Sequence, residues 1–533
     1  MIVGDVLRFA TIYAGYAIVS YVIFLITYRL LLHPLSQYPG PLLAKLTQGY
    51  SGFIAVQKRL HLEIYQYHQR YGPVVRIGPN RLVFNTVTAL RDIYQNDRIT
   101  RARCYVFNPK DKVFNVLNAI DKNIHRSKRQ LVGQAVADRS IRQFEPTMMV
   151  QIDTCLRQIL ESSKDSTAVD ITEKSRHLGL DIVGHLAFGY DLRVQTEEEN
   201  RFIMKALTFG NFRSNIYLQL PILTKLYVNK IFDYIFYEAR EKYYRLLETM
   251  IRTRLAQEKQ AKRDLYYFIA DSVEADPESL RGGDLWMEAL FFLVAGGDTT
   301  ASAICSTFFY LSRNRSCYEK LTSEIRSTFT SGADIKGGPQ LASCHYLRAC
   351  IDESMRMSPP VTSILWREQD TNDKSNDPII VDGHVIPRGT YVGVNAYAIH
   401  HNEDYFPDSF TFQPERWLST SPGLDSPENR AAKKLMQDAF APFSIGYRGC
   451  AGKTMAYLEI SLIVAKALWY FDFHAAPGKL GEVGAGQKGK ANGRERPNEY
   501  QLYDIFASRH DGPFLVFSRR GEHWKELEVP AQT

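Results

Sequence analysis

The 533-residue chain has only seven cysteines, and no two of them form a C-x-x-C pair. An odd cysteine count without this spacing argues against a disulfide framework and against a structural zinc site. The chain also lacks a run of basic residues, and its net charge of +7 is modest for this length. We therefore expect no nucleic-acid partner. Because no linker divides the middle of the chain, we expect one large folded domain.

Long uncharged stretches are scarce in this sequence, but one lies close to the N-terminus. Residues 9–28 contain no charged side chain and are bounded by Arg8 and Arg29. At about 1.5 Å per helical residue, this stretch crosses roughly 30 Å of hydrocarbon. A cleavable signal peptide is the alternative, but the apolar run is too long and no small-residue cleavage site follows it. We expect residues 1–32 to be a membrane anchor with its span at 9–28, and Arg29 and Lys45 favour a cytosolic body.

A glycine-punctuated loop brings one cysteine to the start of an apolar helix near the C-terminus. It carries the pattern Phe-x-x-Gly-x-Arg-x-Cys-x-Gly, in which Phe443, Gly446, Arg448 and Cys450 take fixed positions. Glycines permit a sharp turn and a close approach to a flat ligand. Apolar residues recur at helical spacing over residues 451–471, and a helix N-terminus favours a negative sulfur. We interpret Cys450 as the axial thiolate ligand of a haem iron; the alternative is a small buried hydrophobic residue.

The pattern resembles the haem-thiolate monooxygenases of the cytochrome P-450 superfamily, in particular microsomal members similar to those of filamentous-fungal secondary metabolism. Four motifs of that family occur in the expected order across almost the whole chain. The resemblance implies the cytochrome P-450 fold, mainly α-helical with small β-sheets, in a catalytic domain over residues 33–533 preceded by one transmembrane helix. It also implies haem b as the cofactor. Alternating segments at 71–85 and 382–390 predict short antiparallel strands of such sheets.

The longest apolar helical run after the anchor, residues 284–310, contains Ala295-Gly-Gly-Asp298-Thr299 in its middle. Each glycine weakens a helix by about 1 kcal/mol, so we expect the helix to open here and to leave a pocket for dioxygen. Asp298 and Thr299 match the acid–alcohol pair that relays protons to dioxygen in the resembled family. Alternatively, Asp298 pairs with a basic residue and Thr299 donates back to a helix carbonyl.

Glu353 and Arg356 lie three residues apart on one face of a predicted helix, directly before a proline pair that ends it. An exposed pair of this kind contributes little stability. In the resembled family such a Glu-x-x-Arg joins a later arginine in a buried charge cluster behind the haem, and Arg416 stands in the matching place. We expect these three residues to be structural rather than catalytic.

The resemblance also assigns residues around the haem and the substrate. His125 and Arg129 occupy the place where the family often has Trp-x-x-x-Arg, which binds a haem propionate; a solvated basic helix face is the alternative. Arg367 and Arg448 are further propionate candidates. The β-prone stretch 361–365 is expected to form a strand beside the substrate pocket, whose candidate lining residues are Ala295, Val361, Ile364 and Leu365.

By this resemblance the chain hydroxylates or otherwise oxidises a lipophilic small molecule, using dioxygen and electrons from NADPH. The one G-x-G-x-x-G match, at residues 484–489, has no adjacent strand and no following apolar helix, so we reject a dinucleotide site. We therefore expect a separate NADPH–cytochrome P-450 reductase, with cytochrome b5 as a candidate second donor. The expected location is the endoplasmic reticulum membrane, crossed once, with the catalytic domain facing the cytosol.

Two other functions remain as alternatives. The first is an oxygen-independent haem-thiolate isomerase or dehydratase, against which the Asp298–Thr299 pair argues. The second is a haem-binding electron carrier or sensor, which needs no large apolar pocket beside the iron. Substrate-dependent consumption of dioxygen and NADPH separates all three functions.

Overall fold

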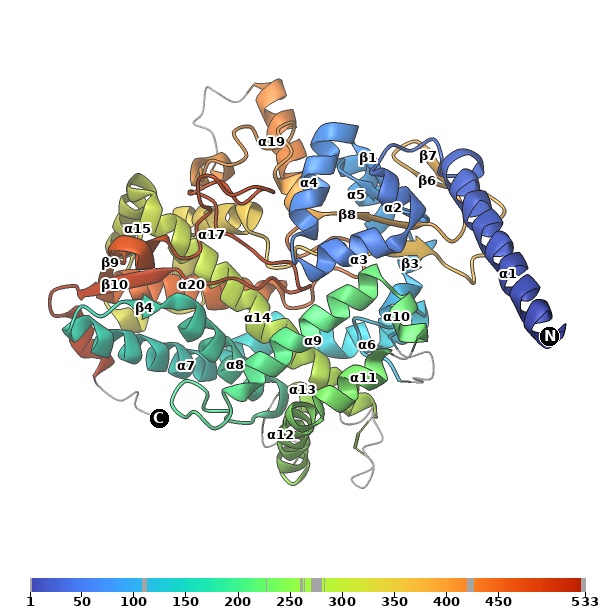
Figure 1. Cartoon of the computed structure of the whole chain (residues 1–533). Coiled ribbons are helices and arrows are strands. Elements are labelled where there is room, and N and C mark those ends of the chain that lie inside the picture. Colours follow the sequence, from blue (N-terminus) through green and yellow to red (C-terminus); the bar gives the residue numbers. More distant parts are fainter. Residues whose placement is uncertain are drawn as a thin grey trace.

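The structure is a computed structural model and describes residues 2–107, 113–226, 228–258, 262, 264–269, 280–281, 283–418 and 426–528. Helices dominate, as expected, and the sheets are small (Figure 1). Helix α14, Asp284–Arg313, passes through the middle of the molecule, and helix α1, Ile2–Thr27, projects away from the body. Helix α20, Lys453–Tyr470, follows the cysteine loop and packs against α14.

The other elements follow in chain order. The helices are α2 Leu42–Leu46, α3 Gln48–Val56, α4 Leu60–Tyr71, α5 Val87–Tyr94, α6 Lys122–Ala135, α7 Asp138–Lys164, α8 Ile171–Phe188, α9 Phe202–Gln219, α10 Ile222–Lys225, α11 Val228–Ile235, α12 Tyr237–Leu255, α13 Leu265–Ile269, α15 Arg315–Thr328, α16 Pro339–Ala342, α17 His345–Met357, α18 Ala396–His400 and α19 Pro427–Ala439. The strands are β1 Val74–Gly78, β2 Arg81–Phe84, β3 Ile99–Arg101, β4 Val169–Asp170, β5 Arg367–Gln369, β6 Ile379–Val381, β7 His384–Ile386, β8 Tyr391–Val394, β9 Phe471–Ala475 and β10 Phe514–Arg519.

The strands form three small sheets. The largest has the order β1-β2-β8-β5-β3, in which only the β2–β8 pair is parallel. A second sheet has the order β4-β10-β9, and β6 and β7 form a hairpin. At the hairpin turn Asp382 and Gly383 have φ values of 51° and 76°, the positive values that a tight two-residue turn requires. The strand pair predicted at 71–85 is confirmed, whereas the hairpin predicted at 382–390 begins earlier, at Ile379, and ends at Ile386.

The strand expected at residues 361–365 does not form. These residues are irregular apart from a single bridge between Val361 and Ala507. One of their backbone carbonyls has a distant side-chain partner instead of a neighbouring strand, since the Thr362 carbonyl accepts a hydrogen bond from Asn395 Nδ2 at 2.7 Å. The β-prone stretch is therefore extended and lies at the wall of the cavity, but side chains from other segments hold it in place of a neighbouring strand.

The glycine pair in α14 serves close packing between helices. A Cβ atom at Gly296 would lie 2.8 Å from Val183 Cγ2, and one at Gly297 would lie 3.1 Å from Leu180 Cδ2. Both neighbours belong to α8, which crosses α14 at this point. Helix α14 stays helical through residues 295–300, so the expected opening of the helix is absent from this described segment. The cost of two glycines in a helix is offset by the close approach of the two helices.

Helix α1 is joined to the body by a stiff junction. One turn of π-helix, Tyr28–Leu32, continues α1, and the guanidinium group of Arg76 donates to the carbonyl oxygens of Arg29 at 2.9 Å and Leu35 at 3.2 Å. Arg76 is fully buried and lies in β1. The segment 5–32 is long and apolar enough to cross a membrane, and none of it is buried; α14 also meets this criterion, but it is mostly buried and serves as a core helix.

A buried charge cluster joins α17 to the segment that follows β8 and α18. The Glu353 carboxylate accepts hydrogen bonds from Arg356 at 2.8 and 2.9 Å and from Arg416 at 3.0 Å. Trp417 Nε1 and the Gln413 backbone N–H also donate to it, both at 3.0 Å. Burial alone would raise the pKa of Glu353, but the two arginines hold the pKa below its usual value. The three charged residues thus meet as expected, with Glu353 and Arg356 fully buried.

Replacing Glu353 by glutamine is expected to destabilise the fold by about 3–5 kcal/mol, because two buried arginines lose their counter-charge. Chemical denaturation followed by circular dichroism measures this loss. The matched control is Glu319→Gln, which removes an exposed pair with Arg315 at 2.7 Å and should cost less than about 1 kcal/mol. Equal effects of the two substitutions would contradict a structural role for the cluster.

Candidate active site

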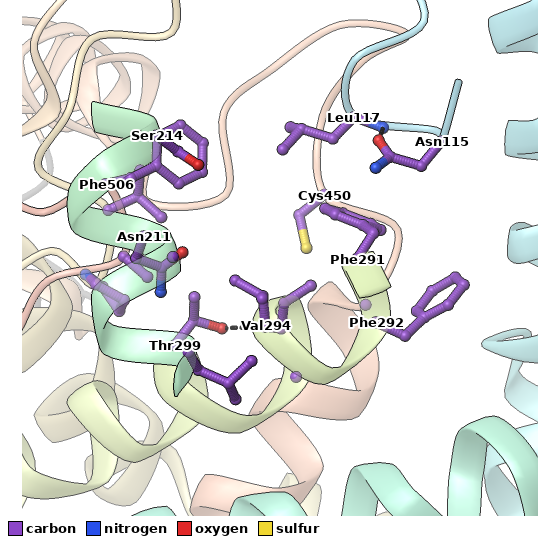
Figure 2. Close-up of a pocket in the computed structure, with 18 of the residues that line it drawn as sticks. Asn115, Leu117, Asn211, Ser214, Phe291, Phe292, Val294, Thr299, Cys450 and Phe506 are labelled. Atoms are coloured by element: carbon purple, nitrogen blue, oxygen red, sulfur yellow. Dashed lines mark hydrogen bonds between the residues drawn. The ribbon is translucent and has the colours of Figure 1, made fainter. Parts of the chain in front are cut away.

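One large cavity lies between α14, α9 and the cysteine loop. Its volume is about 1080 Å³, at the upper limit of the roughly 300–1,000 Å³ that single small-molecule sites occupy. The Cys450 sulfur points into it, and Val294 and Thr299 of α14 also surround it (Figure 2). The cavity therefore has room for a flat cofactor on the sulfur and for a further ligand beyond it.

The cysteine loop is held by backbone geometry. Gly446 has a φ of +74°, and a Cβ atom there would lie 2.0 Å from the Tyr94 carbonyl oxygen. Only glycine fits such a position. The Gly449 N–H donates to the Gly446 carbonyl at 3.0 Å, and the Cys450 N–H donates to the Phe443 carbonyl at 2.9 Å. These contacts fix the sulfur ahead of α20, and Phe443 itself lines the cavity while Gly446 lies behind it.

The environment of Cys450 suits a metal ligand rather than a free thiolate. Cys450 has exposed surface, but that surface faces the cavity, and the surrounding protein removes it from bulk water. Burial raises the pKa of the thiol, and the Gly452 backbone N–H and Arg129 only partly oppose this rise. A bound metal ion would supply the charge that keeps such a sulfur deprotonated.

Beside the sulfur lies a cluster of buried arginines. Arg448 donates to the carbonyl oxygens of Ala119 at 2.7 Å and Ile120 at 3.0 Å, yet its Nε–H has no acceptor among the described residues. Arg367 Nη2 and two nitrogens of Arg101 are likewise buried without an acceptor in this part of the chain. Unpaired buried cations are costly unless an anion joins them. The cluster thus fits the two carboxylates of a haem, and within the described part of the chain no carboxylate side chain forms an ion pair with it.

Burial, together with repulsion between the positive charges of this cluster, lowers the pKa values of Arg367 and of the neighbouring His125. Burial, and then Arg101, lower the pKa of Arg367 to about 9. Burial, and then Arg448 and Arg101, lower the pKa of His125 to about 3, so that its ring is neutral at physiological pH. His125 and Arg129 line the cavity, and His125 is buried; the alternative of a solvated basic face does not hold for His125. Arg367 lies behind the lining, over the Tyr94 ring.

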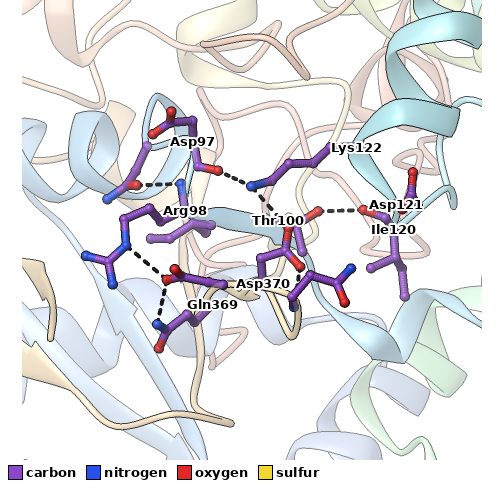
Figure 3. A network of polar contacts seen from close by, with 12 residues as sticks. Asp97, Arg98, Thr100, Ile120, Asp121, Lys122, Gln369 and Asp370 are labelled. Atoms are coloured by element: carbon purple, nitrogen blue, oxygen red, sulfur yellow. Dashed lines mark hydrogen bonds and ion pairs between the residues drawn. The ribbon is translucent and has the colours of Figure 1, made fainter. Parts of the chain in front are cut away.

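Arg101 was missed in the sequence because no motif marks it. It belongs to the three-residue strand β3 and reaches the cavity only because β3 pairs with β5 beside Arg367. A polar network holds this edge in place (Figure 3). The Thr100 hydroxyl donates to the Ile120 carbonyl at 2.7 Å, and Lys122 pairs with Asp370 at 3.1 Å. The network joins β3, β5 and the start of α6, the elements that carry the buried Arg101, the buried Arg367 and the half-buried Arg129.

Asp298 and Thr299 are neighbours in the chain but point to different surroundings. Asp298 accepts hydrogen bonds from Arg176 Nε at 3.0 Å and from Asn211 Nδ2 at 3.3 Å, and it does not line the large cavity. Thr299 lines the cavity and donates to the Ala295 carbonyl at 2.7 Å. Both alternatives, an ion pair for Asp298 and a back-bonded hydroxyl for Thr299, are therefore present in this structure.

The substrate-pocket candidates divide into two groups. Ala295, Val361 and Leu365 line the cavity. Ile364 does not: it is fully buried in the core beside Trp366, and a Cβ atom at Gly393 would touch it at 2.4 Å. Ser363 lines the cavity instead, because Val361, Ser363 and Leu365 share one face of this extended stretch, whereas Thr362 and Ile364 are fully buried outside the lining.

Glu459 of α20 is a second residue that the sequence pattern hid, because it lies within an apolar helical run. It lines the cavity, is buried, and its Oε1 atom has no hydrogen-bond partner among the described residues. Burial raises its pKa from 4.5 to about 8. Because the folded state binds this proton more tightly than the unfolded state, the contribution to stability is complete below the unfolded pKa and declines as the pH rises through 8.

Glu459→Gln is expected to remove this pH dependence. From about pH 5 to about pH 8 the wild type should lose up to about 1.4 kcal/mol of stability per pH unit that the variant retains. Melting temperatures across this pH range provide the measurement. Glu198→Gln, at a carboxylate that is 91% exposed, serves as control and should follow the wild type. Parallel curves for wild type and Glu459→Gln would show that the carboxyl is solvated.

Comparison with known proteins agrees with this geometry. The cytochrome P-450 family model matches residues 34–483. Among curated proteins, the cytochrome P-450 monooxygenase AKT7 of Alternaria alternata is 35% identical over 516 residues, which cover 94% of this chain and 96% of the relative. The cytochrome P-450 monooxygenase poxM of Penicillium oxalicum is 34% identical, with coverage of 94% and 93%, and apf7 of Gibberella fujikuroi is 34% identical, with coverage of 95% and 97%. The chain therefore belongs to the cytochrome P-450 family and is a monooxygenase whose cofactor is haem with a cysteine thiolate on the iron.

Proposed function

We propose that this chain is a membrane-anchored monooxygenase that oxidises a lipophilic small molecule of fungal secondary metabolism, with Cys450 as the iron ligand. The observation that carries the proposal is the meeting, at the wall of a single cavity, of one sulfur with Arg101 and Arg448, whose side chains keep N–H groups without acceptors among the described residues. A haem needs both an axial ligand and cations for its propionates, and the two lie on the same wall. The fungal relatives support the metabolic setting.

Each group of the site has a role in holding the cofactor. Haem, when bound, supplies the activation of dioxygen, and a thiolate ligand favours cleavage of the oxygen–oxygen bond. Cys450 would hold the iron, and Arg101, Arg129 and Arg448 would bind the propionates by charge-assisted hydrogen bonds. Arg367 would add positive potential from behind, and the neutral ring of His125 would donate a single hydrogen bond.

Asp298 and Thr299 would handle protons on the opposite wall. Asp298 is bound to Arg176, which also donates to Thr208 Oγ1 at 2.8 Å. On turning away from Arg176, the Asp298 carboxylate would take up a proton from water and, as the carboxylic acid next to Thr299, would pass that proton on toward the cavity. The Thr299 hydroxyl would rotate from the Ala295 carbonyl and donate to oxygen in the cavity. Glu353, Arg356 and Arg416 would support the fold behind the site.

The remaining proposals concern partners and location. The lining is rich in aromatic and aliphatic residues, which favours a lipophilic substrate. Electrons would come from NADPH through a separate cytochrome P-450 reductase, with cytochrome b5 as a second donor. Residues 1–32 would cross the endoplasmic reticulum membrane once, and domain 33–533 would face the cytosol; the fully exposed apolar surface of α1 supports this arrangement.

The function is tested by measuring dioxygen and NADPH consumption in the presence of a reductase and extracts of the producing fungus. A monooxygenase consumes both in proportion to oxidised product. An isomerase or dehydratase forms product without net dioxygen use, and an electron carrier forms none. Product formation without dioxygen would overturn the proposal.

Cys450→Ala is expected to abolish the absorption band that carbon monoxide gives with thiolate-ligated ferrous haem. Difference spectroscopy of the purified reduced protein measures this band. Cys305→Ala, at a buried cysteine of α14 outside the cavity lining, is the matched control and should keep it. Retention of the band in Cys450→Ala would assign the ligand elsewhere.

Thr299→Ala is expected to lower the yield of product per NADPH by at least about tenfold, because a positioned proton donor typically contributes about 10²–10⁴-fold to the rate of the step that it serves. The ratio of product to NADPH, with released hydrogen peroxide as the balance, measures this uncoupling. Thr307→Ala removes another threonine of α14 that donates back to a helix carbonyl, at 2.8 Å, but lies outside the cavity lining. The Thr307→Ala variant should keep the wild-type ratio of product to NADPH. An equal loss of product in both variants would contradict the proton-relay role of Thr299.

A further inference from the structure

Phe506 combines two unusual properties. It lines the large cavity, and its φ is +87°, a value that side-chain-bearing residues rarely adopt. Figure 2 shows its ring among the side chains that surround the cavity, together with Ser214 and Asn211 of α9. Strained backbone at a cavity wall persists only where the surroundings impose it. Neighbouring residues must therefore hold the loop around Phe506 in this conformation.

The group that holds it is the carboxylate of Asp504, two residues earlier. Asp504 is fully buried, and its Oδ1 atom accepts hydrogen bonds from the Phe506 backbone N–H at 3.4 Å and from Asn215 Nδ2 at 3.1 Å. The Ser363 hydroxyl also donates to this oxygen, and the Asn215 side chain makes a second bond, at 3.0 Å, to the Asp504 carbonyl. One carboxylate oxygen thus gathers donors from three segments.

Those three segments form separate parts of the cavity wall. Asn215 belongs to α9 and follows Ser214, Ser363 belongs to the irregular stretch after α17, and Phe506 belongs to the loop before β10. The same loop is tied further, since the Ser508 N–H donates to the Pro360 carbonyl at 2.8 Å and Ser302 of α14 donates to the Ser508 carbonyl at 3.2 Å. The hydrogen bonds of Asp504 and of Ser508 thus fix the loop on either side of Phe506.

The role of Asp504 is geometric rather than that of an ion-pair partner. No basic side chain of the described residues forms an ion pair with Asp504, and its Oδ2 atom has no hydrogen-bond partner among them. Burial raises the pKa of this carboxyl to about 6. A buried acid without a counter-charge is costly, so its hydrogen bonds to the loop must be worth that cost.

We propose that Asp504 is a positioning residue that sets substrate specificity by holding the Phe506 ring in the cavity wall and by joining α9 to the two loops that face it. The inference rests on the proposed monooxygenase function, because it assigns the cavity to substrate. Loss of the Asp504 carboxylate releases Phe506, and the wall then tolerates ligands of a different size. Phe506 acts on the ligand directly, and Asp504 acts through Phe506.

The test measures the binding of two azoles of different size to the purified haem-loaded protein. Imidazole is small enough to bind iron without reaching the wall, whereas clotrimazole fills the space beyond it, and both shift the haem absorption band on binding. We expect Asp504→Ala and Phe506→Ala to change the ratio of the two dissociation constants by about tenfold in the same direction. The double variant should equal either single variant, because both changes remove the same contact.

Controls separate positioning from folding. Asp504→Asn keeps the Oδ1 acceptor and should retain the wild-type ratio. Asp181→Asn alters another buried carboxylate, which accepts from the backbone N–H groups of Val194 at 2.9 Å and Gln195 at 3.1 Å and lies outside the cavity lining; it should leave the ratio unchanged. If Asp504→Ala fails to fold, Asn215→Ala removes one donor to Asp504 from outside the lining and should reproduce the shift.

Three outcomes overturn the inference: an unchanged ratio in Asp504→Ala, a ratio in Asn215→Ala equal to the wild type, or additive effects in the double variant. Failure of the underlying function is recognised separately. A wild-type protein without the carbon monoxide band of a thiolate-ligated haem would remove the cofactor assignment, whereas a normal band with an unchanged azole ratio would remove only the role of Asp504.

Discussion

Buried positive charge without a matching side-chain anion is the constraint on which this active site depends. Arg101, Arg367 and Arg448 are removed from water and keep N–H groups without acceptors among the described residues. Such an arrangement is unfavourable in the protein alone, and a dianionic cofactor relieves it. The free energy of cofactor binding is therefore drawn in part from the repulsion of these side chains. The hydrogen bonds of Arg448 to backbone carbonyls keep the cations from turning away.

The rest of the fold can be understood as support for the two walls that face each other across the cavity. On one wall, Gly446 lies against the Tyr94 carbonyl and fixes the cysteine loop. On the other wall, Gly296 and Gly297 let α14 pack tightly against α8, and this packing fixes the position of Thr299 relative to the cavity. The glycines at these positions thus make the site more rigid, because two backbones packed this closely leave no room for the segments to shift.

Much of this site could be predicted from the sequence where residues act within one local segment. The cysteine loop, the α14 segment with Asp298 and Thr299, and the Glu353–Arg356 pair are each contained in a few turns of chain. The residues that escaped prediction depend on distant partners. Arg101 reaches the cavity through a strand pairing, Glu459 is hidden in an apolar helix, and Ser363 lines the cavity in place of Ile364 because distant partners decide which face of that extended stretch turns to the cavity. Spacing along a chain does not encode such contacts.

The junction made by Arg76 has a mechanical consequence. Its guanidinium group ties the residues after α1 to the first strand of the large sheet, and Gly40 lies so close to the Arg76 carbonyl that a side chain there would clash at 2.2 Å. A helix held in this way keeps a fixed orientation relative to the body, unlike a helix that is joined by a flexible linker. With α1 in a membrane, as proposed above, the catalytic body would keep one tilt and one height above the bilayer, so that hydrophobic molecules leaving the lipid would always meet the same side of the enzyme.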